Sequence, residues 1–267
     1  MKGLAVLGAM TLACGAAGGA ELEDIHRDFK GAPVKELFFE SIPCDARLGA
    51  SKTGAASVDI VGSDKDEFVW TVELRGSRLE VKQKERRALS RGSSSRCLAT
   101  IKLPDGASVK AVSVSGGLKI SGGLSAVDAE SVSGGVDVQR TGAQDAPVRI
   151  ETVSGDIKLD AAAGDAKVKT VSGSTLLRGL VGSLDFESMS GSLNARWTRL
   201  PARAEILVKT ASGDAELGLP EGKGVNASLN SMSGGVRNEL AFDASAGLTV
   251  KADSMSGRLS LLKIGRP

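Results

Sequence analysis

The residues that could carry out chemistry in this sequence are few and widely spaced. Four aspartates, Asp156, Asp160, Asp165 and Asp214, lie near glycines, where carboxylates could bind calcium or cleave a polysaccharide. Polysaccharide cleavage needs a fixed carboxylate pair, and calcium-binding repeats need a closely spaced Gly-Gly-x-Gly-x-Asp pattern that the sequence lacks. His26 is the only histidine, so a catalytic triad or a histidine-based metal site is hard to build. We therefore expect structural aspartates, no enzyme activity, and no metal or cofactor.

Residues 82–96 form a strongly basic segment that could bind an anion. The basic residues are Lys82, Lys84, Arg86, Arg87, Arg91 and Arg96, against the single acid Glu85. The segment could contact anionic lipid, lipopolysaccharide or a nucleic-acid backbone, but a solvated loop between strands is the favoured interpretation. Aromatic residues make up only 3% of the chain and the net charge is +2, so nucleic acid is not an expected partner.

The N-terminus has the pattern of a secretory signal peptide. Met1-Lys2 gives a positive start, residues 4–13 are apolar, and small residues follow up to Ala20. The pattern predicts a signal peptide over residues 1–20 with cleavage after Ala20, and the apolar stretch is too short to span a bilayer. Residues 11–15 partly resemble a lipobox, so lipidation at Cys14 is the alternative.

Two cysteines, Cys44 and Cys97, remain after such cleavage. An even number in an oxidising compartment favours one disulfide between them, and the alternative is two independent buried thiols. The cysteine pair and the lack of a wall-sorting tail favour a periplasmic protein. Lipid-anchored and secreted forms are the alternatives, and no transmembrane span is expected.

A three-residue motif, an apolar residue followed by Ser-Gly, recurs eight times. The steps between successive serines are 18, 21, 18, 18, 22, 21 and 23 residues. The repeated serines are Ser115, Ser133, Ser154, Ser172, Ser190, Ser212, Ser233 and Ser256. Near-constant spacing of this kind indicates a repeat architecture.

Each repeat shows the alternation of a half-buried strand on both sides of the Ser-Gly turn. Ala166, Val168 and Thr170 alternate with two lysines before one turn, and Ile157-Lys158-Leu159 follows another. A unit of about 20 residues cannot bury its own apolar face, so identical units must stack, each strand pairing with its copy in the next coil. The sequence therefore predicts an all-β fold, a single right-handed β-helix-like solenoid of stacked coils.

The glycine of each turn and the apolar residue before each serine predict the local structure of the turn. Glycine is expected there because it accepts positive φ. The apolar residue before each serine, from Val114 to Met255, alternates to the side opposite the core. Either the strand bends and this residue turns inward, or the repeats form an exposed apolar stripe. The bend is favoured, because Ser-Gly invites a bulge.

The runs Thr152 to Leu159 and Thr170 to Leu177, with the entry Ile101-Lys102-Leu103-Pro104, resemble the adhesin-like or toastrack family of bacterial β-strand-repeat envelope proteins. The resemblance covers about residues 36–264. It implies a right-handed β-helix-like fold, export, and often a link to envelope stress. The chain departs from the family in its cysteine pair and in having no membrane anchor beyond the signal peptide.

We expect one domain, with a less regular cap over residues 21–105 and regular repeats over 106–267; a separate N-terminal domain is the alternative. The expected function is that of a non-enzymatic envelope protein, either adhesin-like or associated with envelope stress. Its partner would be polysaccharide, lipid head groups or protein. The alternative function is a polysaccharide-active β-helix enzyme.

Overall fold

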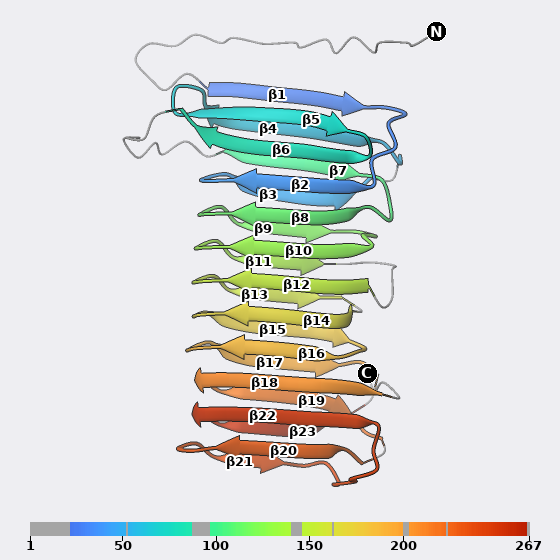
Figure 1. Ribbon diagram of the computed structural model, residues 1–267, viewed down its shortest axis with the longest axis vertical. Helices are drawn as coiled ribbons and strands as arrows, with labels where there is room; N and C mark the ends of the chain where they lie inside the picture. The colour runs from blue at the N-terminus through green and yellow to red at the C-terminus, as the bar shows by residue number, and fades with distance from the viewer. Residues whose placement is uncertain are drawn as a thin grey trace.

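A computed structural model describes residues 22–51, 53–86, 97–139, 146–161, 163–199, 203–222 and 224–265. These ranges contain strands and no helix (Figure 1). The predicted signal peptide, with Cys14 and Ala20, lies outside them.

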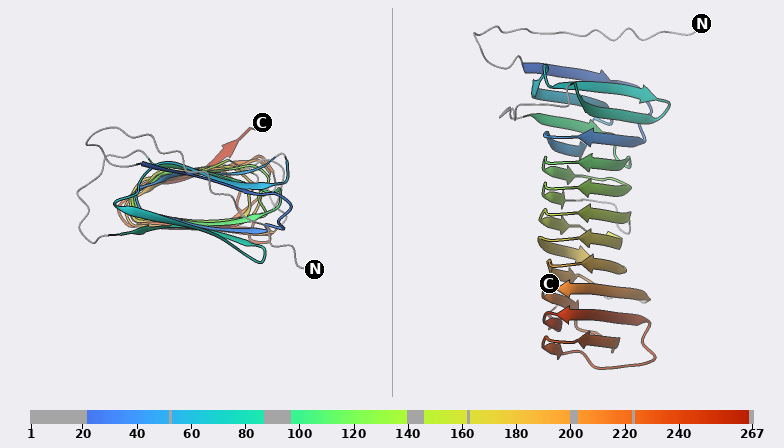
Figure 2. Two further views of the ribbon diagram at one scale, coloured as in Figure 1. Left: turned by 90° about the horizontal axis from the view of Figure 1, so that it is seen from above. Right: turned by 60° about the vertical axis from the view of Figure 1, so that its left-hand side comes forward.

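The strands form two sheets, which we call sheet A and sheet B. Seen along the long axis, they lie on either side of an elongated interior (Figure 2). Sheet A consists of β1 (Leu22–Phe29), β3 (Asp45–Ala50), β4 (Ala56–Asp64), β7 (Leu98–Leu103), β9 (Leu118–Ser121), β11 (Val136–Gln139), β13 (Ile157–Asp160), β15 (Ser174–Leu180), β17 (Ser192–Trp197), β19 (Ala215–Pro220), β21 (Val236–Asn238) and β23 (Leu259–Ile264). Sheet B consists of β2 (Glu36–Ser41), β5 (Phe68–Arg75), β6 (Arg78–Glu85), β8 (Ser108–Ser113), β10 (Ala126–Ser131), β12 (Ala146–Thr152), β14 (Ala163–Thr170), β16 (Leu184–Ser188), β18 (Ala204–Ser212), β20 (Asn226–Ser231) and β22 (Leu248–Ser256).

From β8 to β19 the chain alternates between the sheets. We call one strand of sheet B, its Ser-Gly turn and the following strand of sheet A a coil. Each strand is parallel to its copy in the next coil and in register with it, so that Val127 faces Val148 and Val148 faces Ala166. In this region the predicted pairing of each strand with its copy is confirmed.

The core lies between the sheets and is built from the inward residues of every coil. Val148 and Ile150 of β12 and Val168 of β14 are at most 1% exposed. Larger side chains fill the interior in a few coils, and the indole Nε1–H of the buried Trp197 donates to the Gly182 carbonyl over 2.9 Å. Apolar burial along the whole stack is therefore what stabilises coils that could not fold alone.

Antiparallel strands finish the N-terminal end, so both sheets are mixed. In sheet A, β4 pairs antiparallel with β1 and with β7. In sheet B, β5 and β6 form a hairpin around Arg75-Gly76. The regular parallel stack thus begins only below this end.

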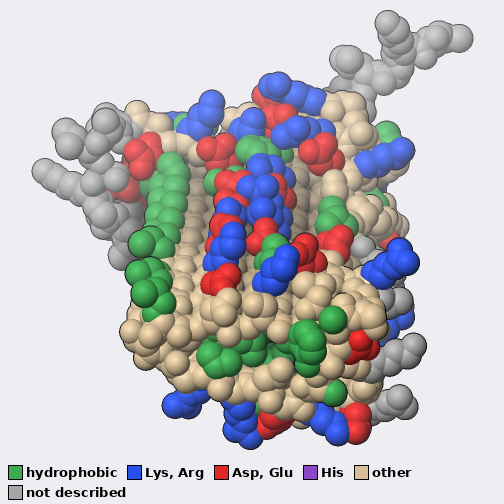
Figure 3. Space-filling model, turned by 60° about the horizontal axis from the view of Figure 1, so that its bottom comes forward, with side chains coloured by type: hydrophobic (Ala, Val, Ile, Leu, Met, Phe, Trp, Pro, Cys, Tyr) green, Lys and Arg blue, Asp and Glu red, His purple; other side chains and the backbone are tan. Residues whose placement is uncertain are grey.

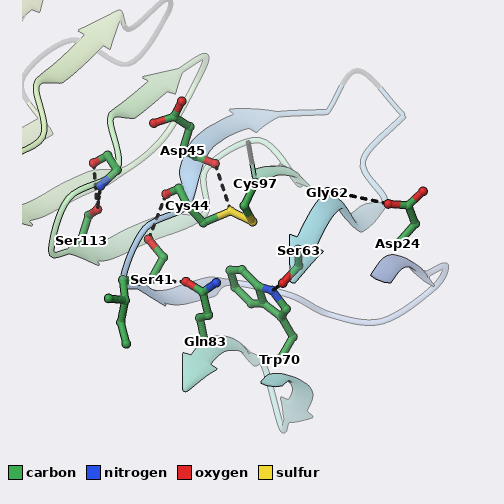
Figure 4. The surroundings of a disulfide bond; sticks show 12 residues. Asp24, Ser41, Cys44, Asp45, Gly62, Ser63, Trp70, Gln83, Cys97 and Ser113 are labelled. Atoms are coloured by element: carbon green, nitrogen blue, oxygen red, sulfur yellow. Dashed lines mark hydrogen bonds between the residues drawn. A yellow bond between two sulfur atoms is a disulfide. The ribbon is translucent and has the colours of Figure 1, made fainter. Parts of the chain in front are cut away.

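The predicted disulfide between Cys44 and Cys97 is confirmed (Figure 4). The two Cα atoms are 4.7 Å apart, and the residues immediately after them, Asp45 of β3 and Leu98 of β7, face each other. Cys44 occupies the position that glycine occupies in later coils, because Ser41 is in register with Ser113. The bond therefore links the first coil to its neighbour on the N-terminal side.

The coils do not follow one another in chain order at the two ends. β2 and β3 lie between β6 and β7 on one side and β8 and β9 on the other. Likewise, β22 and β23 lie between β18 and β19 on one side and β20 and β21 on the other. The prediction that every strand pairs with its copy in the next coil is wrong at these places.

Apolar content explains the order at the C-terminal end. Leu259 and Leu261 of β23 are buried to within 1% exposure, whereas the aligned residues of β21 are Val236 and the polar Asn238. The coil of β22 and β23, which has more apolar residues at core positions, lies between two coils. The coil of β20 and β21, which has fewer, forms the end. Burial of more apolar surface favours this arrangement.

Candidate functional site

A hydroxyl two residues before the turn serine bonds to the backbone of six of the eight Ser-Gly turns. Ser113 lies two residues before the turn serine, and its Oγ accepts a hydrogen bond from Gly116 N at 3.0 Å and lies 2.8 Å from the Gly116 carbonyl, to which it donates. Gly134 N donates in the same way to Ser131 Oγ. In the first coil Ser41 donates to the Cys44 carbonyl. In six of the eight Ser-Gly turns the inward position is therefore occupied by a hydroxyl that satisfies the turn backbone, whereas the hydroxyls of Thr210 and Ser254, at the same position, have no hydrogen-bond partner in the described residues.

The turn serines bond to the neighbouring coil. Ser133 Oγ donates to the Val114 carbonyl over 3.1 Å, and its backbone N donates to the same oxygen over 2.9 Å. Ser115, Ser154, Ser172 and Ser190 make the same side-chain bond to the coil before them. Ser212 and Ser233 bond through backbone N, and Ser256 is in register with Ser212. The eight serines therefore lie where adjacent coils contact each other.

Close stacking, and not positive φ, explains most of the turn glycines. Among the eight, only Gly173 and Gly213 have positive φ, at 124° and 150°. A Cβ on Gly134 would lie 2.1 Å from the Gly116 carbonyl oxygen, and one on Gly155 would lie 2.2 Å from the Gly134 oxygen. The expectation of a general positive-φ turn is therefore wrong. Glycine is required at most of these turns because the backbones of adjacent turns approach too closely for any side chain.

The residues before the turn serines point outward and form a continuous column on sheet B. We call this column the apolar stripe; in spatial order it contains Val114, Val132, Val153, Val171, Met189, Ala211, Met255 and Met232. The valines are 43–48% exposed and the methionines 60–82%, while Ala211 is half-buried. Figure 3 shows the stripe as a column of apolar side chains along the molecule.

The favoured inward bend is therefore wrong, and the exposed alternative is what the structure has. The hydroxyl residue before the stripe already takes the inward position and bonds to the turn, as Ser131 does with Gly134. Strict alternation then turns Val132 outward. The strand continues straight into the turn without a bulge.

Charged side chains form the neighbouring columns and pair across coils. Lys110 Nζ lies 3.0 Å from Asp128 and 2.9 Å from Glu130, and these two carboxylates raise the pKa of Lys110 above its usual range. Lys169 Nζ lies 2.6 Å from Glu187, which raises the pKa of Lys169. These opposite charges neutralise one another along sheet B.

A shallow groove of about 1180 Å³ runs between the stripe and the nearer charged column. Its apolar wall includes Val132, Val153, Val171 and Met189, and Glu151 and Lys169 lie on the polar side. Such a surface is long, open and mainly aliphatic. It can hold an extended apolar ligand, and its paired charges can meet a polar group at the edge.

The aspartates singled out in the sequence bond mainly to the backbone. Asp156 Oδ1 accepts from Ser174 N at 2.8 Å, and Asp214 Oδ1 accepts from Arg258 N at 2.8 Å. Asp165 accepts from Ser183 N at 3.3 Å, and Asp160 lies exposed on β13. In the described residues no three His, Cys, Asp or Glu side chains are grouped so as to hold a metal ion.

Sequence reasoning missed one member of this set, Asp45. Its Oδ1 accepts from Gly117 N at 2.8 Å. The alignment of Cys44 with the turn glycines would have identified it, since Asp156 and Asp214 also follow that position.

The basic segment lies at the N-terminal end, and the structure describes residues 82–86 of it, which include three of its six basic residues. Lys82 Nζ lies 2.8 Å from Glu80 and 4.9 Å from the centre of the Phe38 ring. Lys84 and Arg86 are exposed. Arg87, Arg91 and Arg96 lie outside the described residues. The structure brings none of the three described residues to the groove, so anion contact by this segment stays a prediction.

His26 lies exposed on β1 and is bonded to Asp59 of β4 through Nδ1. This hydrogen bond, with the charge of Asp59, raises the pKa of His26 above its ordinary value of 6.5.

No helix in the described residues is long and apolar enough to cross a membrane.

Solved structures share this fold. A candidate adhesin from Bacteroides fragilis is 16% identical, with a TM-score of 0.58, over 90% of this chain and 97% of that chain. A candidate lipid-binding protein from Parabacteroides distasonis is 15% identical, with a TM-score of 0.51, over 90% of this chain and 96% of that chain. The comparison with curated proteins finds no match. The family model Toastrack DUF4097 matches residues 34–261, and the chain therefore belongs to the Toastrack DUF4097 family.

Proposed function

We propose that this protein is a non-enzymatic binding protein of the cell envelope, and that it holds the hydrocarbon part of an amphipathic envelope lipid along the apolar stripe. The observation that supports this most strongly is the stripe itself. Exposed apolar side chains are usually scattered singly, and a contiguous patch on the order of several hundred Å² is typical of an interaction surface. Here seven of its eight residues are at least 43% exposed, coil after coil.

The dimensions and chemistry of the groove fit a hydrocarbon chain. Strands lie about 4.8 Å apart in a sheet, so eight coils give a stripe roughly 34 Å long. One lipid chain spans half of a bilayer core of about 30 Å, or about 15 Å, which the stripe can accommodate. Its residues are Val, Met and Ala, without the aromatic rings that sugars stack on, and methionine adapts to irregular apolar partners.

We propose the cell envelope as the location of the protein. The signal-peptide pattern of residues 1–20 and the disulfide support export to an oxidising compartment, with the periplasm favoured. The lipid-binding name of the Parabacteroides protein with the same fold agrees with the proposed ligand. In this proposal residues 21–105 form the cap and 106–267 the regular part of a right-handed solenoid, which the parallel registers support.

Binding of a fluorescent long-chain fatty acid tests the role of the stripe. The variant Val153→Ser with Val171→Ser removes two methyl-rich surfaces from the middle of the groove. We expect about a tenfold weaker affinity, equivalent to about 1–2 kcal/mol of lost apolar contact. Val61→Ser is the matched control, because Val61 is 53% exposed on β4, away from the groove. Undetectable binding by the unaltered protein, or equal binding by the double variant, would contradict the proposal.

Vesicles test the basic segment separately. We propose that it attracts anionic head groups, so Lys84→Gln with Arg86→Gln should weaken binding to phosphatidylglycerol vesicles at low salt and leave fatty-acid affinity unchanged. Vesicle binding that is indifferent to both substitutions would remove the basic segment from the function and leave the stripe standing.

A further inference from the structure

The C-terminal end of the stack exposes the edges of both sheets together with part of the core. β20 and β21 are the last strands of sheets B and A, and each pairs with a single strand within the described residues. Leu229 of β20 is half-buried, whereas its partner Ala252 in β22 is 1% exposed. Val236 of β21 is 49% exposed, and its partner Leu259 is 1% exposed. The cross-section of the core is thus partly open here.

Other apolar side chains gather at the same end. Phe242 follows β21, is 65% exposed and forms a bridge to Val225, which precedes β20. Met232, which follows β20, is 82% exposed. Figure 3 shows apolar patches over this end with charged side chains around its rim. An apolar centre with a polar rim is the anatomy of a protein–protein interface.

The opposite end is protected against pairing. β1 carries Glu23, Asp24, His26, Arg27 and Asp28 among its eight residues. Charged edge strands of this kind prevent association. β20 has the sequence Asn-Ala-Ser-Leu-Asn-Ser, without any charge or proline, and so lacks this protection.

We propose that two copies of this chain associate tail to tail, with β20 and β21 of one copy pairing with the same two strands of the other. Charge and shape both favour a second copy of this end as the partner. Antiparallel pairing of β20 with its copy brings no charge opposite a like charge, whereas pairing with the other end would bring a neutral strand against charged β1 or β5.

The same end of a second copy also matches both edges at once. A single strand of another protein could complete only one sheet, but an identical end presents both edges at the same separation: β20, which carries no charge, and β21, whose one charged residue, Arg237, is paired with Glu239. A two-fold axis closes this contact, so the assembly stops at two copies. The association therefore continues the coil-to-coil stacking that builds each chain.

Light scattering coupled to gel filtration, repeated at increasing protein concentration, tests the proposal on the whole mature protein. The weight-average mass should rise toward twice that of one chain and stop there. Val236→Lys and Leu229→Lys should each hold the mass at one chain, since a lysine at the edge opposes pairing. Val236 is already half exposed, so its variant is expected to fold, and circular dichroism checks this.

Two controls make the outcomes decisive. Val61→Lys, at an equally exposed apolar position near the other end, should associate as the unaltered protein does. The stripe variant Val153→Ser with Val171→Ser should also associate normally, which separates this contact from the lipid-binding proposal. A single-chain mass at all concentrations, growth beyond two copies, or unchanged association of folded Val236→Lys would each overturn the tail-to-tail dimer.

Discussion

At most turns of the stack, a hydroxyl and a glycine together allow two backbones to lie close to each other. The hydroxyl, as in Ser113, satisfies the turn from inside. The glycine, as in Gly134, leaves room for the carbonyl of the coil beside it. Outward exposure of the stripe follows, because the hydroxyl residue takes the inward position and the stripe residue directly after it must then point outward.

Gly134→Ala should destabilise the fold because its Cβ would lie 2.1 Å from the Gly116 carbonyl oxygen. We expect a loss of about 1–3 kcal/mol in the free energy of unfolding, as for other overpacked sites. The urea-unfolding midpoint measures it. Gly235→Ala is the control, because a Cβ there meets nothing within 4 Å. Equal midpoints for the two variants would show that the turns can separate without loss.

Two buried threonines should respond in opposite ways to replacement by valine. Thr152 Oγ1 donates to the Gly155 carbonyl and lies 3.1 Å from Thr170 Oγ1, so Thr152→Val should cost about 1–2 kcal/mol. Thr175 is 3% exposed, and its hydroxyl has no hydrogen-bond partner in the described residues, so Thr175→Val should be neutral or stabilising. Thermal unfolding of both variants checks the pair. A larger loss at Thr175 than at Thr152 would contradict this account of the turn.

The sequence predicted the turn residues better than the reason for them. Spacing alone located the eight serines and the alternation around Thr170. It did not decide between the inward bend and the outward stripe, because the Ser-Gly dipeptide is compatible both with a bulge and with a straight strand. The hydrogen bond from Gly134 N to Ser131 Oγ, and its equivalents within other turns, decide between them by holding the hydroxyl inward.

Among the elements, β1 is held to the sheet by backbone pairing with β4 and by the contact of His26 with Asp59. Because the pKa of His26 is raised in the folded protein, the contact stabilises the fold below pH 6.5, the ordinary value. This contribution disappears as the pH rises through the folded pKa. It is expected to be small, since the side chain is 65% exposed.

Asp59→Asn should return the pKa of His26 toward 6.5, because Asp59 supplies the largest contributions to the shift. A proton NMR titration of the imidazole ring measures this directly. Asp28→Asn is the matched control and should lower the pKa less, since Asp28 contributes less. If the two variants gave equal titrations, the β1–β4 contact would not exist as described.

The order of the elements was harder to predict than the elements themselves. The hairpin of β5 and β6 has a local turn signal, the dipeptide Arg75-Gly76, in which Gly76 has a positive φ. The exchange of the last two coils has no local signal, because β20 and β22 share one alternation and either fits beside β18. Only Asn238, a polar residue at a core position, marks the coil that forms the end.

In the whole molecule each coil contacts only its neighbours, so local stability should vary along the stack. The end coil of β20 and β21 has one neighbour in the described residues, while β22 and β23 have two. We expect faster amide hydrogen exchange in residues 226–238 than in residues 248–264. Mass spectrometry of peptic fragments at a concentration that keeps the protein monomeric provides the measurement. Equal protection of both segments would show that the stack opens only as one unit.

The proposed binding surface is likewise a property of the whole molecule. Each coil adds one residue to the stripe, and no single repeat shows a groove. Summing the pattern over eight repeats did suggest the exposed stripe as an alternative, but the paired charges beside it, such as Lys169 with Glu187, depend on which coils become neighbours.

At the C-terminal end, the order of the strands in the sheets differs from their order in the chain. β20 and β21 precede β22 and β23 in the chain, whereas β18 pairs with β22 in the folded protein. A chain that folded in the order of its synthesis could first pair β20 with β18 in the repeat's own register. Such a chain would reach the final order only after β22 had displaced β20.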